Sequence, residues 1–476
     1  MLTVRRRFGF KASFLTALAV IALALGAGPR GGERPVEHPI VLFTLEGLRP
    51  DVVAGLGGEP GWTPNFDRFL RSADWAGRAV APSSALIPST VSLLTGLRPW
   101  QHQVIAPGEK VLDLSLFTLG ERLSDLGYQA RGYTDSTDLA AGFGFSRGLR
   151  SFTALRRGAR AASDLASLGS RKQFVWIHLP APAPPYLRKP WMVKRLGTSG
   201  PELPQRVDAG DFEPYLDPAV PLPAARREEL WAMYRLNVVN ADTLLGRLLS
   251  ALDSRPDGQQ AIVAVTSLYG QEFREQGQIG AGLGLGRSEI EVPLAIRLPR
   301  GFSRKLAPPP TERVELLRLS STLLEAAGGE APPALPPSLF HRSSTPLLSE
   351  LYQVAGANEF SLVEGDLQLR WRARFADAES LYFKLRRESL GQERESPARQ
   401  SLRALVGRLN SLFRRSLPLS GAIGPPQLSL ERWLAQGTER VEDPDQARAM
   451  AERLRLAWGR SVGAERPREQ EERERR

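Results

Sequence analysis

Two residue types on which many metal and thiol sites depend are scarce in this chain. Its 476 residues include no cysteine, which excludes disulfide bonds, zinc–thiolate sites and thiol catalysis. Only four histidines are present, His38, His102, His178 and His341, so we do not expect a metal site built from imidazoles. No motif for binding DNA or RNA is visible either.

What the chain does have is enough apolar material for a large core, together with a surplus of positive charge. With 42% hydrophobic residues, it can bury one large core, or form one large domain with a smaller one. The net charge of +11 comes mostly from arginines scattered along the sequence. Dispersed basic residues are typical of a solvated surface, so we expect no nucleic acid among the partners.

The first 28 residues have the pattern of an export segment. A basic region, Arg5-Arg6-Arg7 with Lys11, precedes an apolar run over 12–28, and Ala22-Leu23-Ala24 offers a small-residue cleavage site. The run of about 17 residues is slightly short for a membrane span, which needs about 20. We therefore favour a signal peptide and keep an uncleaved membrane anchor as the alternative.

Export determines where the rest of the chain is expected to act. A Gly/Pro/Arg-rich linker follows at 29–37. Beyond it we expect a protein that is periplasmic, or anchored to the inner membrane and facing the periplasm. In the second case the N-terminal segment provides the association with the membrane.

After the linker, apolar runs alternate with amphipathic ones, which predicts a doubly wound, mostly parallel α/β sheet flanked by helices over 38–345. The run at 40–45 is almost entirely apolar, as a parallel strand covered on both faces should be. Thr63-Pro64 predicts the start of a helix. Further strands are expected at 129–134, 174–178, 261–266 and 292–298, and further helices at 116–126, 228–253 and 314–327.

The C-terminal part has a different composition. Residues 346–395 are expected to form a small antiparallel β subdomain, because 360–375 places apolar residues on both sides of Glu364-Gly365-Asp366, a hairpin pattern. A further strand is considered at 380–385. Residues 396–463 are predicted to be helical and basic, and 464–476 to be a disordered charged tail.

The most informative segment starts at Leu86 and reads Leu-Ile-Pro-Ser-Thr-Val-Ser-Leu-Leu-Thr-Gly, ending at Gly96. It resembles the nucleophile motif of the sulfatase branch of the alkaline phosphatase superfamily, Cys/Ser/Thr-x-Pro-Ser-x-x-x-Leu-Leu-Thr-Gly. The resemblance implies that position 86 should carry the attacking side chain. Leucine has no nucleophilic atom, so the motif is present without its chemistry.

Other segments resemble landmarks of the same family in the same order. Residues 40–51 resemble the first strand and its metal-binding end, and 63–67 resemble the Thr-Pro-Asn-Leu-Asp that follows. The resemblance implies a sulfatase-like fold over about 38–345, with a weaker likeness of the family's small C-terminal sheet to about 390. Further matches lie at 119–128, 144–149, 261–270 and 292–294.

In that family the cleft holds a divalent cation, a nucleophile, and basic side chains for the ester oxygens. Glu46 stands at the first metal position, but the Asp-His-Gly or Asp-Asn-Gly motif reads Leu268-Tyr269-Gly270. Alanines stand where two of the family's histidines are implied. The resemblance therefore implies a vestigial cleft with no catalytic and no metal-binding residue, made of Glu46, Leu86, Ala183, Leu268, Tyr269 and Ala281.

A few polar residues near these positions need an interpretation. Ser89 is interpreted as an N-cap or first-turn residue of a helix, and His102 as a hydrogen-bonded structural histidine. Candidate contacts for an anion are Arg49, Arg98, Arg147 and His178, although the same structural interpretation is favoured for His178.

The sequence thus favours an exported pseudoenzyme that binds an anionic ligand or scaffolds an envelope partner, with no cofactor. Two alternatives stay open. The first is an active sulfuric or phosphoric ester hydrolase or phospho-group transferase with an atypical site around Glu46, which would need Ca²⁺ or Mg²⁺. The second is a membrane-associated interaction protein that acts through its basic C-terminal helices.

Overall fold

The computed structural model describes residues 37–104, 112–155, 158–169, 172–197, 203–307, 313–343, 346–352, 357–374, 427–434 and 438–463. The chain separates into two units, Met1–Glu37 and His38–Arg476. The predicted export segment, the strand considered at 380–385 and the charged tail lie outside the described residues. Among the helices that the structure describes, none is both long and apolar enough to cross a membrane.

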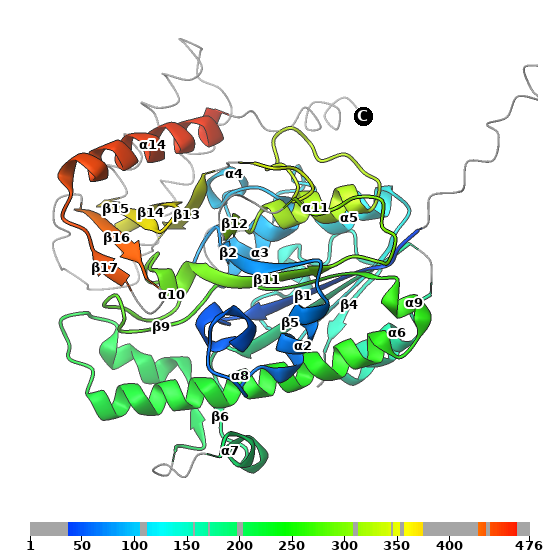
Figure 1. The fold of residues 1–476 in the computed structure, drawn as a ribbon, viewed down its shortest axis with the longest axis horizontal. Helices are drawn as coiled ribbons and strands as arrows, with labels where there is room; N and C mark the ends of the chain where they lie inside the picture. The colour runs from blue at the N-terminus through cyan, green and yellow to red at the C-terminus, as the bar shows by residue number, and fades with distance from the viewer. Residues whose placement is uncertain are drawn as a thin grey trace, which may run out of the picture. The chain divides into compact units, whose positions relative to one another are not determined.

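The larger unit is built on an eight-stranded sheet with the order β12-β2-β11-β8-β1-β5-β3-β4 (Figure 1). β11 runs antiparallel to both of its neighbours, and the other pairs are parallel. The predicted mostly parallel α/β sheet is therefore confirmed. The strands are β1 Ile40–Glu46, β2 Trp75–Val80, β3 Gln129–Thr134, β4 Ser151–Ala154, β5 Gln173–Pro182, β8 Ile262–Ser267, β11 Glu291–Arg297 and β12 Arg313–Glu315.

The central strands are covered on both faces because nearly all of their residues are apolar. Every residue of β1 and β8 is buried, and alternate side chains enter opposite apolar clusters, since successive residues of a strand point to opposite faces. Val41 and Phe43 belong to one cluster, and Ile40 and Leu42 to the other. This burial explains why the continuous apolar runs predicted these strands.

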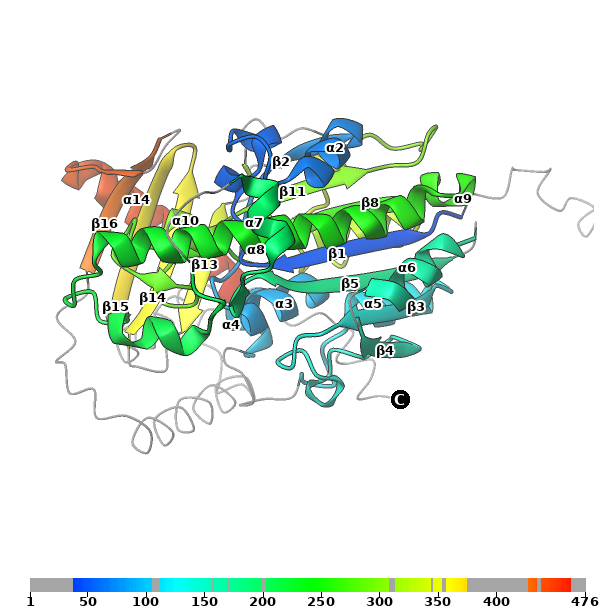
Figure 2. The ribbon, with the colours of Figure 1, turned by 90° about the horizontal axis from the view of Figure 1, so that it is seen from below.

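Helices form one layer on each side of the sheet (Figures 1 and 2). One layer contains α2 (Pro64–Ser72), α6 (Ala159–Ala166) and α8 (Ala224–Asp253), which pack on one apolar cluster. The other contains α3 (Leu86–Thr95), α5 (Leu119–Asp125) and α11 (Arg318–Ala326), which pack on the second cluster. The shorter elements are η1 Pro50–Val52, η2 Ala54–Leu56, α4 Pro99–His102, η3 Ala141–Phe143, β6 Tyr186–Leu187, α7 Pro190–Leu196, β7 Arg206–Val207, η5 Ala209–Tyr215, α9 Pro256–Gln259, β9 Glu272–Phe273, β10 Ile279–Gly280 and α10 Arg287–Ile290.

Two of the predicted helices begin later than expected. α5 starts at Leu119 because Thr118 and Glu121 form a capping box there. The prediction of a helix over 314–327 was wrong at its start. Residues 313–315 form the edge strand β12, which pairs with β2, and the helix begins only at Arg318. Strands β2 and β4 were not predicted. They are short or partly exposed and lack a continuous apolar run.

A second, five-stranded antiparallel sheet follows, with the order β13-β14-β15-β16-β17. The hairpin predicted at Glu364-Gly365-Asp366 joins β14 to β15, and Gly365 adopts the positive φ of 61° that the turn requires. Helix α14 packs on this sheet through Met450 and Leu454. The elements are β13 Leu347–Tyr352, β14 Ala357–Glu364, β15 Leu367–Arg374, β16 Gln427–Trp433, β17 Thr438–Arg440 and α14 Pro444–Gly463.

The prediction that 396–463 is helical was wrong for β16 and β17. β16 pairs with β15, more than fifty residues earlier in the chain, and such a distant pairing leaves little local signal. Only α14 matches the predicted helical character among the described residues of that stretch.

Candidate functional site

The predicted site residues gather where the three central parallel strands end. Glu46 is the last residue of β1, which lies between β5 and β8. The Ala183 N–H donates to the Glu46 carbonyl oxygen at 2.9 Å, and the Leu268 N–H donates to the Leu45 carbonyl oxygen at 2.9 Å. The carboxyl ends of parallel strands are where open α/β sheets bind ligands. We name Glu46, Gly47, Ala183, Leu268, Tyr269 and Gln271 the strand-end site.

Both carboxylate oxygens of Glu46 are held by protein donors. His178 Nε2 lies 2.6 Å from Oε1, and the Tyr269 hydroxyl donates to Oε2 at 3.2 Å. Glu46 is 7% exposed and His178 is fully buried. A buried carboxylate is stabilised by such charge-assisted hydrogen bonds, which replace the water that it loses.

The other ring nitrogen of His178 completes a chain of hydrogen bonds behind Glu46. His178 Nδ1 lies 2.9 Å from Thr44 Oγ1, and the Trp176 indole N–H donates to the same hydroxyl at 2.9 Å. An indole N–H can only donate, so the Thr44 hydroxyl oxygen accepts from Trp176. His178 therefore lies between Thr44 and Glu46 in a chain of side-chain hydrogen bonds. No sequence pattern predicted these hydrogen bonds.

Tyr269 occupies the middle position of the degenerate Leu268-Tyr269-Gly270 motif. Burial, and then the neighbouring Glu46 carboxylate, raise the pKa of the Tyr269 hydroxyl well above its ordinary value. The phenol therefore stays protonated at neutral pH and acts as a donor. Tyr269 therefore donates a hydrogen bond to Glu46. The resemblance implies a metal ligand at this position of the motif.

Gln271, which the sequence did not single out, lies among the small residues of the site. A Cβ added at Gly47 would lie 3.5 Å from Gln271 Oε1 and 3.6 Å from the Ala183 Cβ, and one at Gly280 would lie 3.9 Å from Gln271 Nε2. Gln271 is 1% exposed, and its Oε1 has no hydrogen-bond partner in the part of the chain that the structure describes. Burial of a glutamine depends on packing between distant segments, so no local pattern indicated it.

Leu86 is the first residue of α3, the helix start at which the resemblance implies a nucleophile. Its side chain is partly buried and packs on the same apolar cluster as Leu268 and Tyr269, as does Ala281. Ser89 lies in the first turn of α3, where its hydroxyl donates to the Leu268 carbonyl oxygen at 2.6 Å. The start of α3 is therefore linked to Leu268 and Tyr269 by apolar packing and by the hydrogen bond from Ser89.

His102 has the hydrogen bonds expected of a structural histidine. Its Nε2 lies 2.9 Å from Ser92 Oγ, and its Nδ1 accepts from the Val104 N–H at 3.1 Å. The ring is 1% exposed. These contacts fix α4 to α3.

Comparisons with known proteins were informative at the level of structure. No protein-family model and no curated protein matches the chain by sequence. A 2-O GAG sulfatase superposes with a TM-score of 0.55 at 17% identity, covering 80% of this chain and 94% of that one. A phosphonate monoester hydrolase from Silicibacter pomeroyi superposes with a TM-score of 0.55 at 15% identity, covering 85% and 99%. The chain therefore has a sulfatase-like fold.

A third match is to a protein solved with its substrate D-glucosamine-2-N,6-O-disulfate, with a TM-score of 0.55, 13% identity, and coverage of 81% and 100%. At such identities the likeness establishes the sulfatase-like fold alone. What this chain does must be argued from its own side chains.

The side chains of the strand-end site do not fit the divalent cation that sulfatase-like enzymes use. Mg²⁺ and Ca²⁺ need several oxygen ligands. Glu46 supplies the one carboxylate at this position, and its two oxygens accept from His178 and Tyr269. Within the described part of the chain, no group of three or more His, Asp or Glu side chains is arranged to hold a metal ion.

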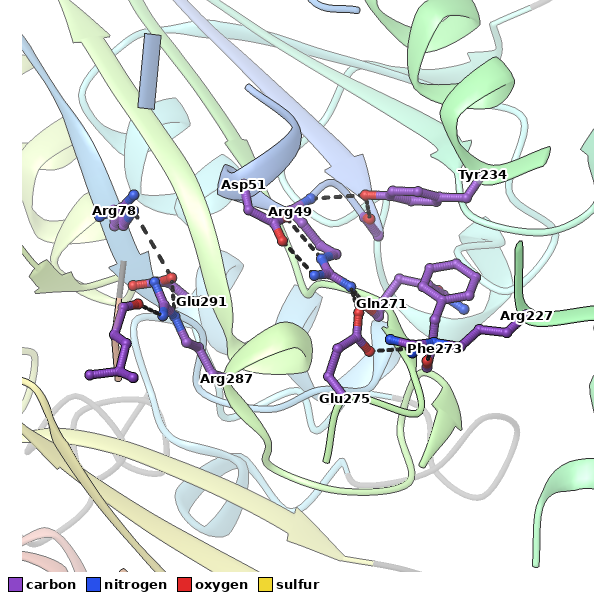
Figure 3. A network of polar contacts seen from close by, with 12 residues as sticks. Arg49, Asp51, Arg78, Arg227, Tyr234, Gln271, Phe273, Glu275, Arg287 and Glu291 are labelled. Atoms are coloured by element: carbon purple, nitrogen blue, oxygen red, sulfur yellow. Dashed lines mark hydrogen bonds and ion pairs between the residues drawn. The ribbon is translucent and has the colours of Figure 1, made fainter. Parts of the chain in front are cut away.

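Arg49, a predicted anion contact, is surrounded by acceptors of the chain itself (Figure 3). Its guanidinium pairs with Asp51 and with Glu275 at 2.6 Å, and it donates to the Gln271 carbonyl oxygen at 3.0 Å. Burial alone would lower the pKa of Arg49, but the carboxylates of Asp51 and Glu275 raise it above its ordinary value. Arg49 therefore connects η1 to the loop after β9.

Arg98 and Arg147 also have carboxylate partners. Arg98 pairs with Glu315 of β12 and donates to the Leu348 carbonyl oxygen at 3.2 Å, which joins the two sheets. Arg147 pairs with Glu121 at 2.9 Å, next to α5. That any of these arginines, or His178, contacts an anion stays a prediction.

A second group of buried carboxyl groups lies where strand β9 and helix α10 meet the five-stranded sheet. We name Glu272, Glu289, Glu359, Glu431 and Arg370 the seam cluster. Arg370 pairs with Glu359 at 3.5 Å and with Glu431. Glu272 and Glu289 are fully buried, and Oε2 of each has no hydrogen-bond partner among the described residues.

Burial with few hydrogen-bond donors raises the pKa values of two carboxyl groups in the seam cluster. Burial raises the pKa of Glu272 to about 7. Burial, and then the carboxylates of Glu272 and Glu359, raise the pKa of Glu289 well above its ordinary value. Glu289 therefore takes up a proton more readily than an exposed glutamate does. No sequence pattern distinguished these glutamates from exposed ones.

Proposed function

We propose that this protein is a catalytically inactive protein with a sulfatase-like fold, a pseudoenzyme that serves as a binding or scaffold component of the cell envelope. The observation that carries the proposal is the state of Glu46. Its two oxygens accept from His178 and Tyr269. The nearby helix start, where a nucleophile is implied, carries Leu86.

Cleavage of a sulfate or phosphate ester needs both an activated nucleophile and charge stabilisation. An attacking hydroxyl needs a base or a metal that lowers its pKa, and the leaving group needs charge stabilisation. The isobutyl side chain of Leu86 supplies no attacking atom. Glu46 satisfies its charge with protein donors, so it does not need a cation to offset it.

The neighbouring serines support the same conclusion. A serine nucleophile requires a base within hydrogen-bond reach. Ser89 donates to the carbonyl oxygens of Ser83 and Leu268. The Ser84 hydroxyl is buried and has no hydrogen-bond partner within the described ranges. In the described structure, none of these contacts supplies a basic side chain.

Location and ligand class rest on other features. The basic and apolar segment over 1–28 supports export to the envelope. The net charge of +11 supports a negatively charged ligand or partner, because such a surface attracts anions. The basic stretch after 396, on which the alternative of a membrane-associated interaction protein rests, lies mostly outside the described residues.

The test is turnover by the purified full chain. Aryl sulfate, aryl phosphate and phosphonate esters are offered with and without Mg²⁺, Ca²⁺, Mn²⁺ or Zn²⁺, and no turnover above background is expected. Leu86→Ser should not create activity, because the new hydroxyl would have neither a base nor a metal. Metal-dependent turnover that Glu46→Ala abolishes, while the exposed control Glu213→Ala keeps it, would establish the enzyme alternative instead.

A further inference from the structure

The short segment around α7 projects from the outer helix layer. β6 pairs with β7, and α7 lies between them in sequence. Figure 1 places α7 on the side of α8 that faces away from the sheet, and Figure 2, seen from below, shows it in front of α8. Tyr186, Met192 and Val207 are buried in the apolar cluster that includes α8. The segment is therefore held firmly on the body.

The outward face of α7 combines one large aromatic side chain with positive charge. Trp191 is 40% exposed, although tryptophan is highly buried on average. Lys194 and Arg195 follow at the i+3 and i+4 positions, which share a helix face with Trp191. Lys189 precedes the helix and is also exposed. From residue 186 to residue 197 there are four cations and no acidic residue.

Two of these four cations are available to an external partner. Lys189 and Lys194 form no ion pair within the part of the chain that the structure describes. Arg195 interacts electrostatically with the carboxylate of Asp242. The segment thus carries an exposed indole ring together with three cations that are close to it in sequence.

We propose that Trp191, Lys189, Lys194 and Arg195 form a docking surface for an anionic lipid bilayer. Indole rings prefer the headgroup boundary, where their apolar body is buried and their N–H stays hydrated. Lysine and arginine next to the ring are attracted to anionic headgroups. The combination matches the two components of an interfacial lipid contact.

The size of the patch favours a bilayer over an acidic protein. A helix of seven residues is about 10 Å long, whereas a stable protein interface buries roughly 800 Å² on each partner. A bilayer needs no complementary groove, and it presents many headgroups to a small projecting helix.

The chain outside the described residues supports the same partner. The apolar run over 12–28 is joined to the body by a linker at 29–37. Nine extended residues span at most about 32 Å, so a retained anchor would keep the body next to a membrane. A weak second contact on the body is then strengthened by its high effective concentration.

The absence of cysteine allows a local test in the full chain. Pro190→Cys is labelled with a polarity-sensitive dye next to Trp191, and Lys305→Cys, at an exposed position elsewhere, carries the same dye as a control. Vesicles of phosphatidylglycerol with phosphatidylcholine should shift the emission to the blue at 190 and not at 305. Phosphatidylcholine vesicles should give no shift at either position.

Charge and ring are then removed separately in the labelled protein. Lys189→Ala with Lys194→Ala should lower the apparent affinity of the dye response for anionic vesicles by roughly 30-fold, the effect expected for two surface cations. Trp191→Ser should weaken it as well, and Arg150→Ala should not. The proposal is overturned if position 190 fails to respond to anionic vesicles, responds equally to neutral ones, or responds only to an acidic polypeptide.

Discussion

The strand-end site and the seam cluster both bury carboxyl groups, but they treat them differently. At the strand ends, each oxygen of Glu46 has a donor, from His178 or Tyr269. In the seam cluster, Glu272 and Glu289 each have one oxygen that finds no hydrogen-bond partner among the residues described. A buried acid is tolerated in its charged form when donors surround it, and otherwise takes up a proton. The first region therefore surrounds its carboxylate with donors, whereas in the second region burial raises the pKa of Glu272 and Glu289.

The largest effect is expected from breaking the first arrangement. His178→Ala removes a fully buried partner and leaves Glu46 short of a donor next to a new cavity. A loss of about 3–5 kcal/mol in the free energy of unfolding is expected, measured by urea denaturation. His341→Ala, at an exposed histidine beside Glu325, is the control and should cost less than about 1 kcal/mol. Equal losses in the two variants would show that the hydrogen bonds of His178 to Thr44 and Glu46 do not contribute to stability.

The seam cluster should respond in the opposite direction. The pKa of Glu272 is raised to about 7, above its value in the unfolded chain. Its contribution to stability is therefore present in full below about pH 4.5 and is lost as pH rises through about 7. Glu272→Gln should raise stability at pH 8 by at most about 3 kcal/mol and change little at pH 4.5.

Denaturation curves at several pH values check this change against the exposed control Glu213→Gln. The difference between the variant and the parent should grow between pH 5 and pH 8. If Glu272→Gln left the pH profile of stability unaltered, the seam cluster would not be the pH-sensitive region of the body.

A smaller loss of stability is expected when the second donor to Glu46 is removed. Tyr269→Phe removes the hydroxyl that donates to Glu46 at 3.2 Å and leaves the ring in place. We expect a loss of about 1.5 kcal/mol, at the lower end for a hydrogen bond to a charged group because the contact is long. Combining it with Glu46→Gln should cost less than the sum of the two single changes. Strict additivity in this double-mutant cycle would mean that the two side chains are not coupled.

The same contrast explains how far the sequence could predict the structure. β1 and β8 were predictable because their runs are apolar throughout and both faces are covered. β16 was not, because its pairing with β15 is distant in sequence. Leu86 could be assigned to the nucleophile position because the residues that follow it, up to Gly96, resemble a known motif.

The partners of the buried polar groups could not be placed in the same way. Gln271 and Glu289 are buried by segments far apart in the chain, and their neighbours in sequence give no sign of it. His178 was recognised as structural, but its position between Thr44 and Glu46 depends on the register of β1 against β5. Local patterns thus predict elements, and only the assembled sheet defines which side chains meet.

The central claim is that Glu46 is satisfied by the protein and leaves no divalent-metal site at the strand ends. Thermal unfolding of the full chain with and without Ca²⁺ or Mg²⁺ tests it most directly. A metal that bound the native state at a hundred times its Kd would add about 2.7 kcal/mol of stability and raise the Tm. The account predicts the same Tm with metal and with chelator. A rise in Tm that Glu46→Gln removes and Glu213→Gln preserves would contradict it.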